Sequence, residues 1–292
     1  MVKKGLLSLD VVLSLAILAA MGVLVHRITV GLDYSWNWGA IPQYLFRYDA
    51  RAGAWVPNLL VQGLLNTIRL SLWGILLASL LGTIVGLCRV SRSLFGRLLG
   101  RLYVELVRNL PPLVLVFIFY FFVSEQVLPT SAMENFIRSL SGDLQRFLTL
   151  LFAPPSLLSP FLSGLIALAV FEGAYIAEIV RAGIESVEKG QWEASSALGL
   201  TRVQQMRHVI LPQAVRRILP PLAGQFISTV KDSAIVSVIS IQELTFQGLD
   251  LMSSTYLTYE IWITVTFLYL TLTLSLSLAV SGVEVRLRRV QT

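Results

Sequence analysis

The sequence predicts an all-α integral membrane protein with about six transmembrane helices. Of its 292 residues, 55% are hydrophobic and only 14% are charged, and the mean hydropathy is +0.73. A soluble domain carries about 25% charged residues. Apolar runs close to the roughly 20 residues that a helix needs to cross a bilayer recur along the chain. The runs are Leu6–Val25, Leu60–Leu87, Leu102–Ser124, Phe161–Ala182, Ile218–Ile241 and Tyr259–Val280.

The first run has two interpretations. It resembles a signal peptide because Lys3 and Lys4 precede the apolar core. However, that core is about 20 residues long, and no cleavage site of the Ala-x-Ala type follows it. We therefore expect residues 1–58 to be a retained membrane anchor followed by an external segment. That segment carries the aromatic residues typical of a membrane interface, namely Trp36, Trp38 and Trp55.

The distribution of basic residues predicts the orientation of the spans. With a cytoplasmic N-terminus, most of the 23 lysines and arginines fall on the cytoplasmic side and both termini lie there. The pI near 9.7 is then a consequence of topology, and we expect no nucleic-acid partner. The cytoplasmic set is Lys3, Lys4, Arg89, Arg92, Arg97, Arg101, Arg181, Lys189, Arg202, Arg207, Arg216, Arg217, Arg286, Arg288 and Arg289, and the external set is Arg27, Arg47, Arg51, Arg138 and Arg146.

Prolines and one short apolar run modify this simple picture. Pro111 and Pro112 are expected to kink the third span, and the adjacent prolines Pro220 and Pro221 the start of the fifth. Residues 125–160 contain DLQRFLTLLFAPPSLLSP, which is too short to cross the bilayer. We expect an interfacial or re-entrant helix there.

The chain lacks the side chains that a membrane-embedded enzyme would need. Cys88 is the only cysteine, so there is no disulfide framework and no thiolate metal cluster. The two histidines, His26 and His208, are far apart in the sequence. We therefore expect no catalytic residues and no metal site.

One long polar stretch lies between the fourth and fifth runs, on the side predicted to be cytoplasmic. Residues 191–198 are rich in helix formers, and Gly199 follows where a left-handed residue would end the helix. Thr201 with Gln204 has the form of a capping box, so a second helix begins at once. Pro212 is expected to stop or kink that helix. The pattern predicts a compact helical knob that could dock on another protein.

This stretch resembles the cytoplasmic EAA loop of permeases in bacterial ATP-binding-cassette (ABC) importers. Glu193-Ala194-Ser195, Gly199 and Leu211-Pro212 stand at the family's spacing, with Ser195 in place of the usual alanine. Val209 likewise replaces the usual isoleucine. Four other stretches, covering much of residues 60–285, are similar to the polar-amino-acid branch, the histidine, glutamine and glutamate permease type. They are NTIRLSL at 66–72, YVELVRNLPPLV at 103–114, GAYIAEIVRAGIESVEKGQWEA at 173–194 and LPPLAGQFISTVKDSAIVSVISIQEL at 219–244.

The resemblance implies the permease architecture of a type I ABC importer. Its transmembrane domain would occupy residues 59–285, with the EAA loop at about 188–214 and a basic cytoplasmic tail at 286–292. The loop would act as a coupling helix that passes the closure of a separate ATPase to the spans. The residues carried over for this coupling are Glu193, Ala194, Ser195, Leu198 and Gly199.

The resemblance also implies partners in a bacterial plasma (inner) membrane. They are an ABC ATPase dimer, a second permease chain that is identical or homologous, and an external substrate-binding protein, around a chain embedded in the lipid bilayer. No lysine follows a glycine anywhere in the chain, so the Gly-Lys of a phosphate-binding loop is absent. We therefore expect ATP and Mg to be bound by the ATPase, and no cofactor by this chain.

Polar and ionisable residues within the spans are candidates for a substrate path, because charges in a bilayer are costly and usually functional. An amino acid carries an ammonium and a carboxylate, which opposite charges would complement. Lys231 and Asp232 are expected in the middle of the fifth span. They would either line the path or form a structural ion pair. The candidate path residues are Lys231, Asp232, Glu172, Asn66 and Thr67.

Other charges have a local explanation. Glu105 with Arg108, and Glu178 with Arg181, are three residues apart and are expected to pair along their own helices.

The function that these patterns favour is that of a membrane permease subunit, forming the translocation path of an ATP-driven amino-acid importer. The rival is an ion-coupled secondary amino-acid transporter. Such a transporter would need no docking loop, and internal repeats, common in that class, are not evident here.

Overall fold

The computed structural model describes residues 2–31, 34–51, 53–124, 135, 137 and 139–289, which are mostly helical. Most of the segment 125–138, including Arg138, and the last three residues of the predicted tail therefore lie outside the described residues. The chain divides into two compact units, Met1–Gly39 and Ala40–Thr292.

The first unit is a single long helix with an aromatic cluster after it. Helix α1 (Val2–Gly31) contains the first predicted span. Its apolar part, Val11–Val23, exposes its large apolar side chains, as a helix surrounded by lipid would. Trp36 and Trp38 stack with ring centroids 5.8 Å apart, and a 3-10 turn, η1 (Trp38–Ala40), follows. The retention of this helix as an anchor stays a prediction.

The second unit opens with a hairpin that the sequence analysis did not anticipate. Helix α2 (Ile41–Leu45) leads into strands β1 (Phe46–Asp49) and β2 (Ala54–Pro57), which pair antiparallel. Gly53 takes a φ of +61° in the connection, a conformation that glycine adopts without strain. Both strands are short and mostly exposed, so no buried apolar face marked them as strands in the sequence.

Helices make up the rest of the second unit, joined by π and 3-10 segments. They are α3 (Leu59–Arg89), α4 (Leu94–Asn109), α5 (Pro112–Ile118), the π-helix η2 (Phe119–Ser124), α8 (Gly142–Leu151), the 3-10 turn η3 (Pro155–Leu157), α9 (Leu158–Glu185), α10 (Lys189–Ala197), α11 (Arg202–Gln205), the π-helix η4 (Met206–Ile210), α12 (Leu211–Asp232), the 3-10 helix η5 (Ser233–Ile239), α13 (Leu244–Thr255) and α14 (Thr258–Arg289).

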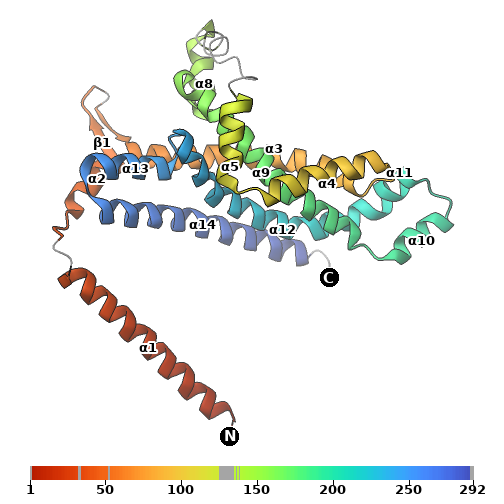
Figure 1. Ribbon diagram of the computed structural model, residues 1–292, viewed down its shortest axis with the longest axis horizontal. Coiled ribbons are helices and arrows are strands. Elements are labelled where there is room, and N and C mark those ends of the chain that lie inside the picture. The colour runs from red at the N-terminus through yellow and green to blue at the C-terminus, as the bar shows by residue number, and fades with distance from the viewer. Residues whose placement is uncertain are drawn as a thin grey trace. The chain divides into compact units, whose positions relative to one another are not determined.

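The core of the unit is the pair α3 and α9, which run side by side (Figure 1). They approach closely because α3 presents glycines at the crossing. A Cβ placed on Gly82 would lie 2.7 Å from the Cβ of Ile176, and one on Gly86 would lie 2.8 Å from the Cβ of Val180. Small residues at a crossing let two backbones pack by van der Waals contact, the main source of helix association in lipid.

Four helical stretches among the described residues are long and apolar enough to cross a membrane. They are Leu59–Arg89, Pro155–Glu185, Arg202–Ile239 and Thr258–Gly282. These match the second, fourth, fifth and sixth predicted runs. The fold is therefore the predicted all-α membrane architecture.

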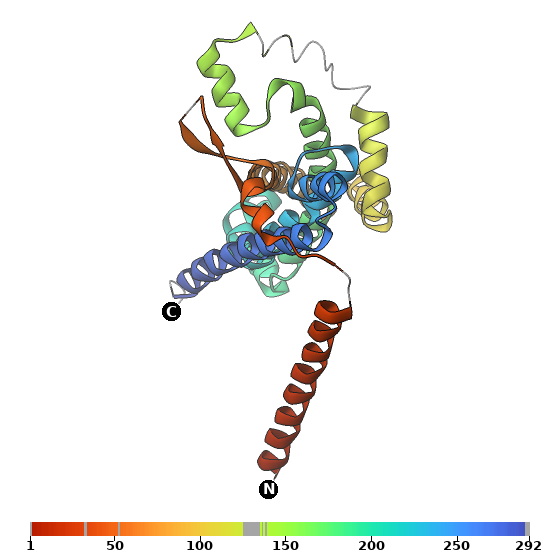
Figure 2. The same cartoon turned by 90° about the vertical axis from the view of Figure 1, so that its left-hand side faces the viewer.

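The third predicted span, Leu102–Ser124, is broken rather than continuous. Helices α4 and α5 meet at 113° across Leu110 and Pro111, and Pro112 is the first residue of α5. The two prolines were expected to kink this span, and they do so strongly. Helix α5 and the short helix α8 project to one side of the long helices (Figures 1 and 2). Helix α8 has 10 residues and does not span, as predicted for this segment.

The fifth predicted span also differs from expectation. The α-helix ends at Asp232 and continues as the 3-10 helix η5. Lys231 and Asp232 therefore lie at the end of α12 but within the apolar stretch Arg202–Ile239, and their position in the middle of a span stays a prediction. Pro220 and Pro221 lie inside α12, which continues through them.

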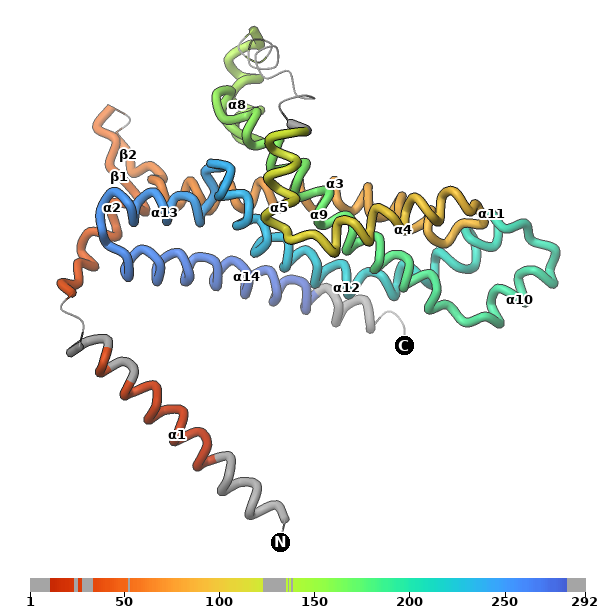
Figure 3. The backbone as a smooth tube through the Cα atoms, viewed as in Figure 1, coloured from red at the N-terminus to blue at the C-terminus, as the bar shows by residue number. Residues whose placement is uncertain are grey.

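The two ends of the second unit carry different structures. Figure 3 shows α10 and α11 at one end of α3, and the hairpin with α2 at the other. The polar stretch and the first turns of α3 thus lie at opposite ends of the second unit.

Candidate functional site

The polar stretch, residues 188–214 and here named the coupling segment, forms two short helices joined by a sharp turn. Gly199 has a φ of +74°. The N–H of Leu200 donates to the carbonyl of Ser195 at 3.2 Å, and that of Gly199 donates to the carbonyl of Ser196 at 2.9 Å. These bonds satisfy carbonyls at the end of α10. The glycine turn predicted from the sequence is confirmed.

A capping box begins the second helix, as predicted. The hydroxyl of Thr201 accepts from the backbone N–H of Gln204 at 3.4 Å. In return, the Gln204 carbonyl oxygen Oε1 accepts from the N–H of Thr201 at 2.9 Å. Pro212 was expected to stop or kink this helix, and it does not stop it, because α11 continues through η4 into α12. The wider π-helical turns lie directly before Pro212, where a regular helix would bring its ring against a carbonyl.

Four of the five predicted coupling residues lie on the surface of this segment. Glu193, Ala194, Leu198 and Gly199 are exposed, and Leu198 is 80% exposed. Ser195 is buried instead, and its hydroxyl donates to the carbonyl of Trp192 at 2.9 Å. Val203, which the sequence analysis did not single out, is 76% exposed across the turn. The segment therefore offers apolar side chains on an otherwise polar surface.

Contacts hold the coupling segment in a defined shape. The guanidinium of Arg202 lies 3.8 Å from the ring centroid of Trp192, which joins α11 to α10. The amide of Gln205 donates to the carbonyl of Leu200 at 2.9 Å, and the amide of Gln213 donates to Gln191 at 3.2 Å. The segment is continuous with α12 through η4.

An ion-pair network ties the adjoining end of α9 to α3. Glu178 pairs with Arg181, as predicted, and also with Arg89 of α3. Arg181 in turn pairs with Glu185. This network links the two core helices next to the coupling segment.

The predicted pairing of Glu105 with Arg108 was wrong. Glu105 pairs with Arg101 one turn earlier, at 2.6 Å between Nε and Oε1. Arg108 instead lies 5.3 Å from the ring centroid of Tyr175 on α9.

The five candidate path residues fall into two groups. In the first, Glu172 of α9 is fully buried and accepts from the amide of Gln225 at 2.6 Å. The carboxyl of Asp232 lies near it, while Oε1 of Glu172 has no hydrogen-bond partner among the described residues. Asp232 is half-buried, whereas Lys231 is exposed. The structure therefore brings two carboxyl groups together inside the helix bundle.

Asn66 and Thr67 belong to the second group, near the start of α13. The Asn66 amide donates to the carbonyl of Gln242 at 2.8 Å. Thr67 is buried, and its hydroxyl donates to Glu243 at 3.4 Å and accepts from the N–H of Leu244 at 3.1 Å. This group links the first third of α3 to the segment between η5 and α13.

Glu243 is the residue of this group that sequence reasoning missed. It is fully buried, caps α13 through the N–H groups of Thr245 and Phe246, and accepts from the hydroxyl of Tyr269 at 2.7 Å. Burial raises the pKa of its carboxyl above the usual value, and these hydrogen bonds oppose the rise. The sequence signal for this role was an acidic residue directly before an apolar helix, because a carboxylate is favoured at a helix N-terminus.

Comparison with known proteins identifies the family. The model of the binding-protein-dependent transport system inner membrane component matches residues 74–289. The probable glutamine ABC transporter permease of Bacillus subtilis is 34% identical over 232 residues, which cover 80% of this chain and 94% of that protein. The glutamate/aspartate import permease of Escherichia coli is 33% identical over 229 residues, covering 78% and 85%.

A solved structure agrees in fold. The crystal structure of an amino acid ABC transporter with histidines matches with a TM-score of 0.66 and 30% identity, over 87% of this chain and 100% of that one. The relatives are transport subunits, which gives no support to the ion-coupled rival. This chain belongs to the family of inner membrane components of binding-protein-dependent transport systems.

Proposed function

We propose that this chain is the permease subunit of an ATP-driven importer of polar amino acids, coupled to a separate ATPase through residues 188–214. The observation that carries the proposal is the shape of the coupling segment. A left-handed glycine and a capping box fix its turn, and Leu198 and Val203 are exposed beside that turn. Exposed apolar side chains rimmed by polar residues are typical of a protein contact surface. The substrate class is supported by the relatives, which are named for glutamine and for glutamate and aspartate.

Membership of the family implies an ATPase and a substrate-binding protein as partners in general. We infer that the assembly contains an ATPase dimer and a second permease chain, identical or homologous. ATP and Mg would be bound by the ATPase, and no cofactor by this chain.

The chain is a multi-pass membrane protein, and we infer that both termini are cytoplasmic. Arg92, from the connection between α3 and α4, lines one pocket together with Arg202 and Arg207 of the coupling segment. Basic residues from two separate connections thus gather at one end of α3. That clustering supports a cytoplasmic location for this end.

Affinity purification of the tagged chain in gentle detergent tests the proposal. We expect an ABC ATPase to copurify, and reconstituted complexes with the binding protein to take up amino acids only when ATP is supplied. Double substitution of Glu193 and Gly199 should reduce the recovered ATPase by about tenfold, because both residues are exposed on the surface that we propose for docking. A chain that purifies alone and moves amino acids without ATP would contradict the proposal.

For the substrate path, we propose that the carboxyls of Glu172 and Asp232 face the ammonium of the substrate during passage. They lie together within the bundle, on α9 and at the end of α12. Lys231 would meet the carboxylate, and Asn66 and Thr67 would contribute from α3. The alternative remains a structural role for these charges.

Substitution of the two carboxyls separates these alternatives. Glu172→Gln and Asp232→Asn should each lower ATP-driven uptake by about tenfold or more, because a hydrogen bond to a charged group is lost. Asp250→Asn, an exposed carboxylate on α13, is the control and should leave uptake unchanged. A structural role predicts a different result. The Tm of the variants would fall, and uptake per amount of folded protein would stay unchanged.

A further inference from the structure

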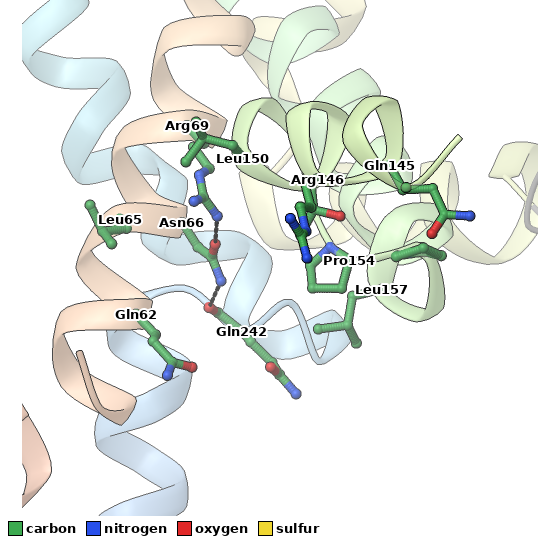
Figure 4. A pocket seen from close by; sticks show the side chains of 13 residues that line it. Gln62, Leu65, Asn66, Arg69, Gln145, Arg146, Leu150, Pro154, Leu157 and Gln242 are labelled. Carbon is green, nitrogen blue, oxygen red and sulfur yellow. Dashed lines mark hydrogen bonds between the residues drawn. The ribbon is translucent and has the colours of Figure 1, made fainter. Parts of the chain in front are cut away.

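A pocket of about 650 Å³ lies at the end of α3 opposite the coupling segment. Its walls come from the first turns of α3, from α8 and the Pro154–Leu157 turn, and from Gln242 (Figure 4). Neither Glu172 nor Asp232 is among its lining residues. The pocket is therefore separate from the carboxyl pair.

The ionisable residues among those lining the pocket are two arginines, Arg69 and Arg146. The other polar lining groups are the amides of four side chains and one hydroxyl, and no described lining residue is Asp or Glu. Figure 4 shows Arg69 and Asn66 on α3 at one side and Arg146 on α8 at the other. The polar lining residues are Gln62, Asn66, Gln145, Thr149 and Gln242.

An amide relay positions the first guanidinium. Nη1 of Arg69 donates to Oδ1 of Asn66 at 3.0 Å, and Asn66 donates to the carbonyl of Gln242 at 2.8 Å. The partner of Arg69 in this relay is thus a neutral amide, and Arg69 belongs to none of the ion pairs found among the described residues. A guanidinium has five N–H donors, and this bond uses one of them.

The second guanidinium is placed by the seating of α8 on α3. The indole N–H of Trp73 donates to the carbonyl of Leu151 at 3.0 Å, and the Trp73 ring stacks on Phe152 at 4.8 Å. Arg146 belongs to none of the ion pairs found among the described residues. Two helices thus bring two guanidinium groups to one pocket, and neither has an ion-pair partner in the part of the chain that the structure describes.

Two guanidinium groups in one pocket favour a ligand that carries two carboxylates. A guanidinium binds a carboxylate through two parallel hydrogen bonds. A neutral amino acid offers one carboxylate and an ammonium, for which the pocket provides only amide and hydroxyl oxygens. An acidic amino acid has a second carboxylate for the second guanidinium. We propose that this pocket binds acidic amino acids through Arg69 and Arg146, and that the importer's preferred substrates are of this class. The inference rests on the proposed function of the chain.

Direct binding to the purified permease–ATPase complex tests this inference without the selectivity of the binding protein. Radiolabelled glutamate, aspartate and glutamine are the probes, measured by equilibrium dialysis at low and high salt. We expect the two acidic amino acids to bind at least about tenfold more tightly than glutamine, because charge-assisted hydrogen bonds are the stronger ones. High salt should reduce this difference.

Variants of the two arginines locate the site. Arg69→Gln and Arg146→Gln should each weaken glutamate binding by about tenfold or more. Arg146→Lys should lose less, because it keeps the charge without the bidentate geometry. Arg47→Gln, an exposed arginine on β1 outside the pocket, is the matched control and should bind glutamate as the unaltered complex does.

Three results would overturn the inference while leaving the proposed function intact. They are equal affinity for glutamine and glutamate, no amino-acid binding to a complex that still performs ATP-driven uptake, and unchanged glutamate binding in both arginine variants. If the arginine variants bind glutamate normally but are no longer stimulated in ATPase activity by the binding protein, the two arginines contact that protein instead. Absence of ATP-driven uptake of any amino acid would refute the proposed function itself.

Discussion

Gly199→Val is expected to lower ATP-driven uptake by at least about tenfold while the protein remains folded in the membrane. At a φ of +74°, an L-residue costs about 1–2 kcal/mol more than glycine, and a β-branched one is the least tolerated. A Cβ at this position meets nothing within 4 Å, so the effect comes from the backbone rather than from a clash. Relief of the strain would rotate the turn and displace Leu198. Uptake, coupled ATPase activity and membrane level are the measurements.

Two controls isolate the backbone effect at this turn. Gly190→Val places the same side chain in open space in the same segment, at a glycine without a positive φ, and should retain uptake. Gly199→Asn should retain most uptake, because asparagine tolerates the left-handed region. Equal activity of the two valine variants would show that the turn does not control coupling.

Gly86→Val is expected to prevent most of the protein from folding. Its Cβ would lie 2.8 Å from the Cβ of Val180 and 2.9 Å from the carbonyl oxygen of Ala177, a backbone atom that cannot move aside alone. Helices α3 and α9 would have to separate along the core of the unit. Overpacking typically costs about 1–3 kcal/mol, and a clash with backbone lies at the high end. The readouts are monodisperse yield in detergent and the apparent Tm.

Gly224→Val is the matched control for this prediction. Gly224 lies within α12, and a Cβ there meets nothing within 4 Å. The control should keep a nearly unaltered yield and Tm, since it adds the same volume and the same helix propensity. Similar losses in both variants would mean that propensity, not the close crossing, decides stability.

Local features of the site could be predicted from the sequence. The turn at Gly199 and the capping box of Thr201 with Gln204 depend only on residues that are close together in the sequence. Both could therefore be predicted without the tertiary structure. The same holds for the break at Pro111 and Pro112, although its 113° angle was not foreseeable. The resemblance to a permease family was carried by such local patterns.

Contacts between distant segments could not be predicted in the same way. Thr67 meets Glu243 across 176 residues, and Gln225 meets Glu172 across 53. Which residues meet depends on how each helix is rotated about its axis. A span that is apolar on every side does not mark the face that will pack against protein.

Short-range patterns in the chain are enough to predict a helical membrane protein with a structured polar loop, because hydropathy, helix caps and left-handed glycines act over a few residues. Three features follow from the packing of the helices alone: α12 ends at Asp232, Lys231 is exposed, and Arg69 and Arg146 share a pocket. The physical reason is that side-chain packing between α3, α8, α9 and α12 sets helix rotation and depth, and no single helix carries that information.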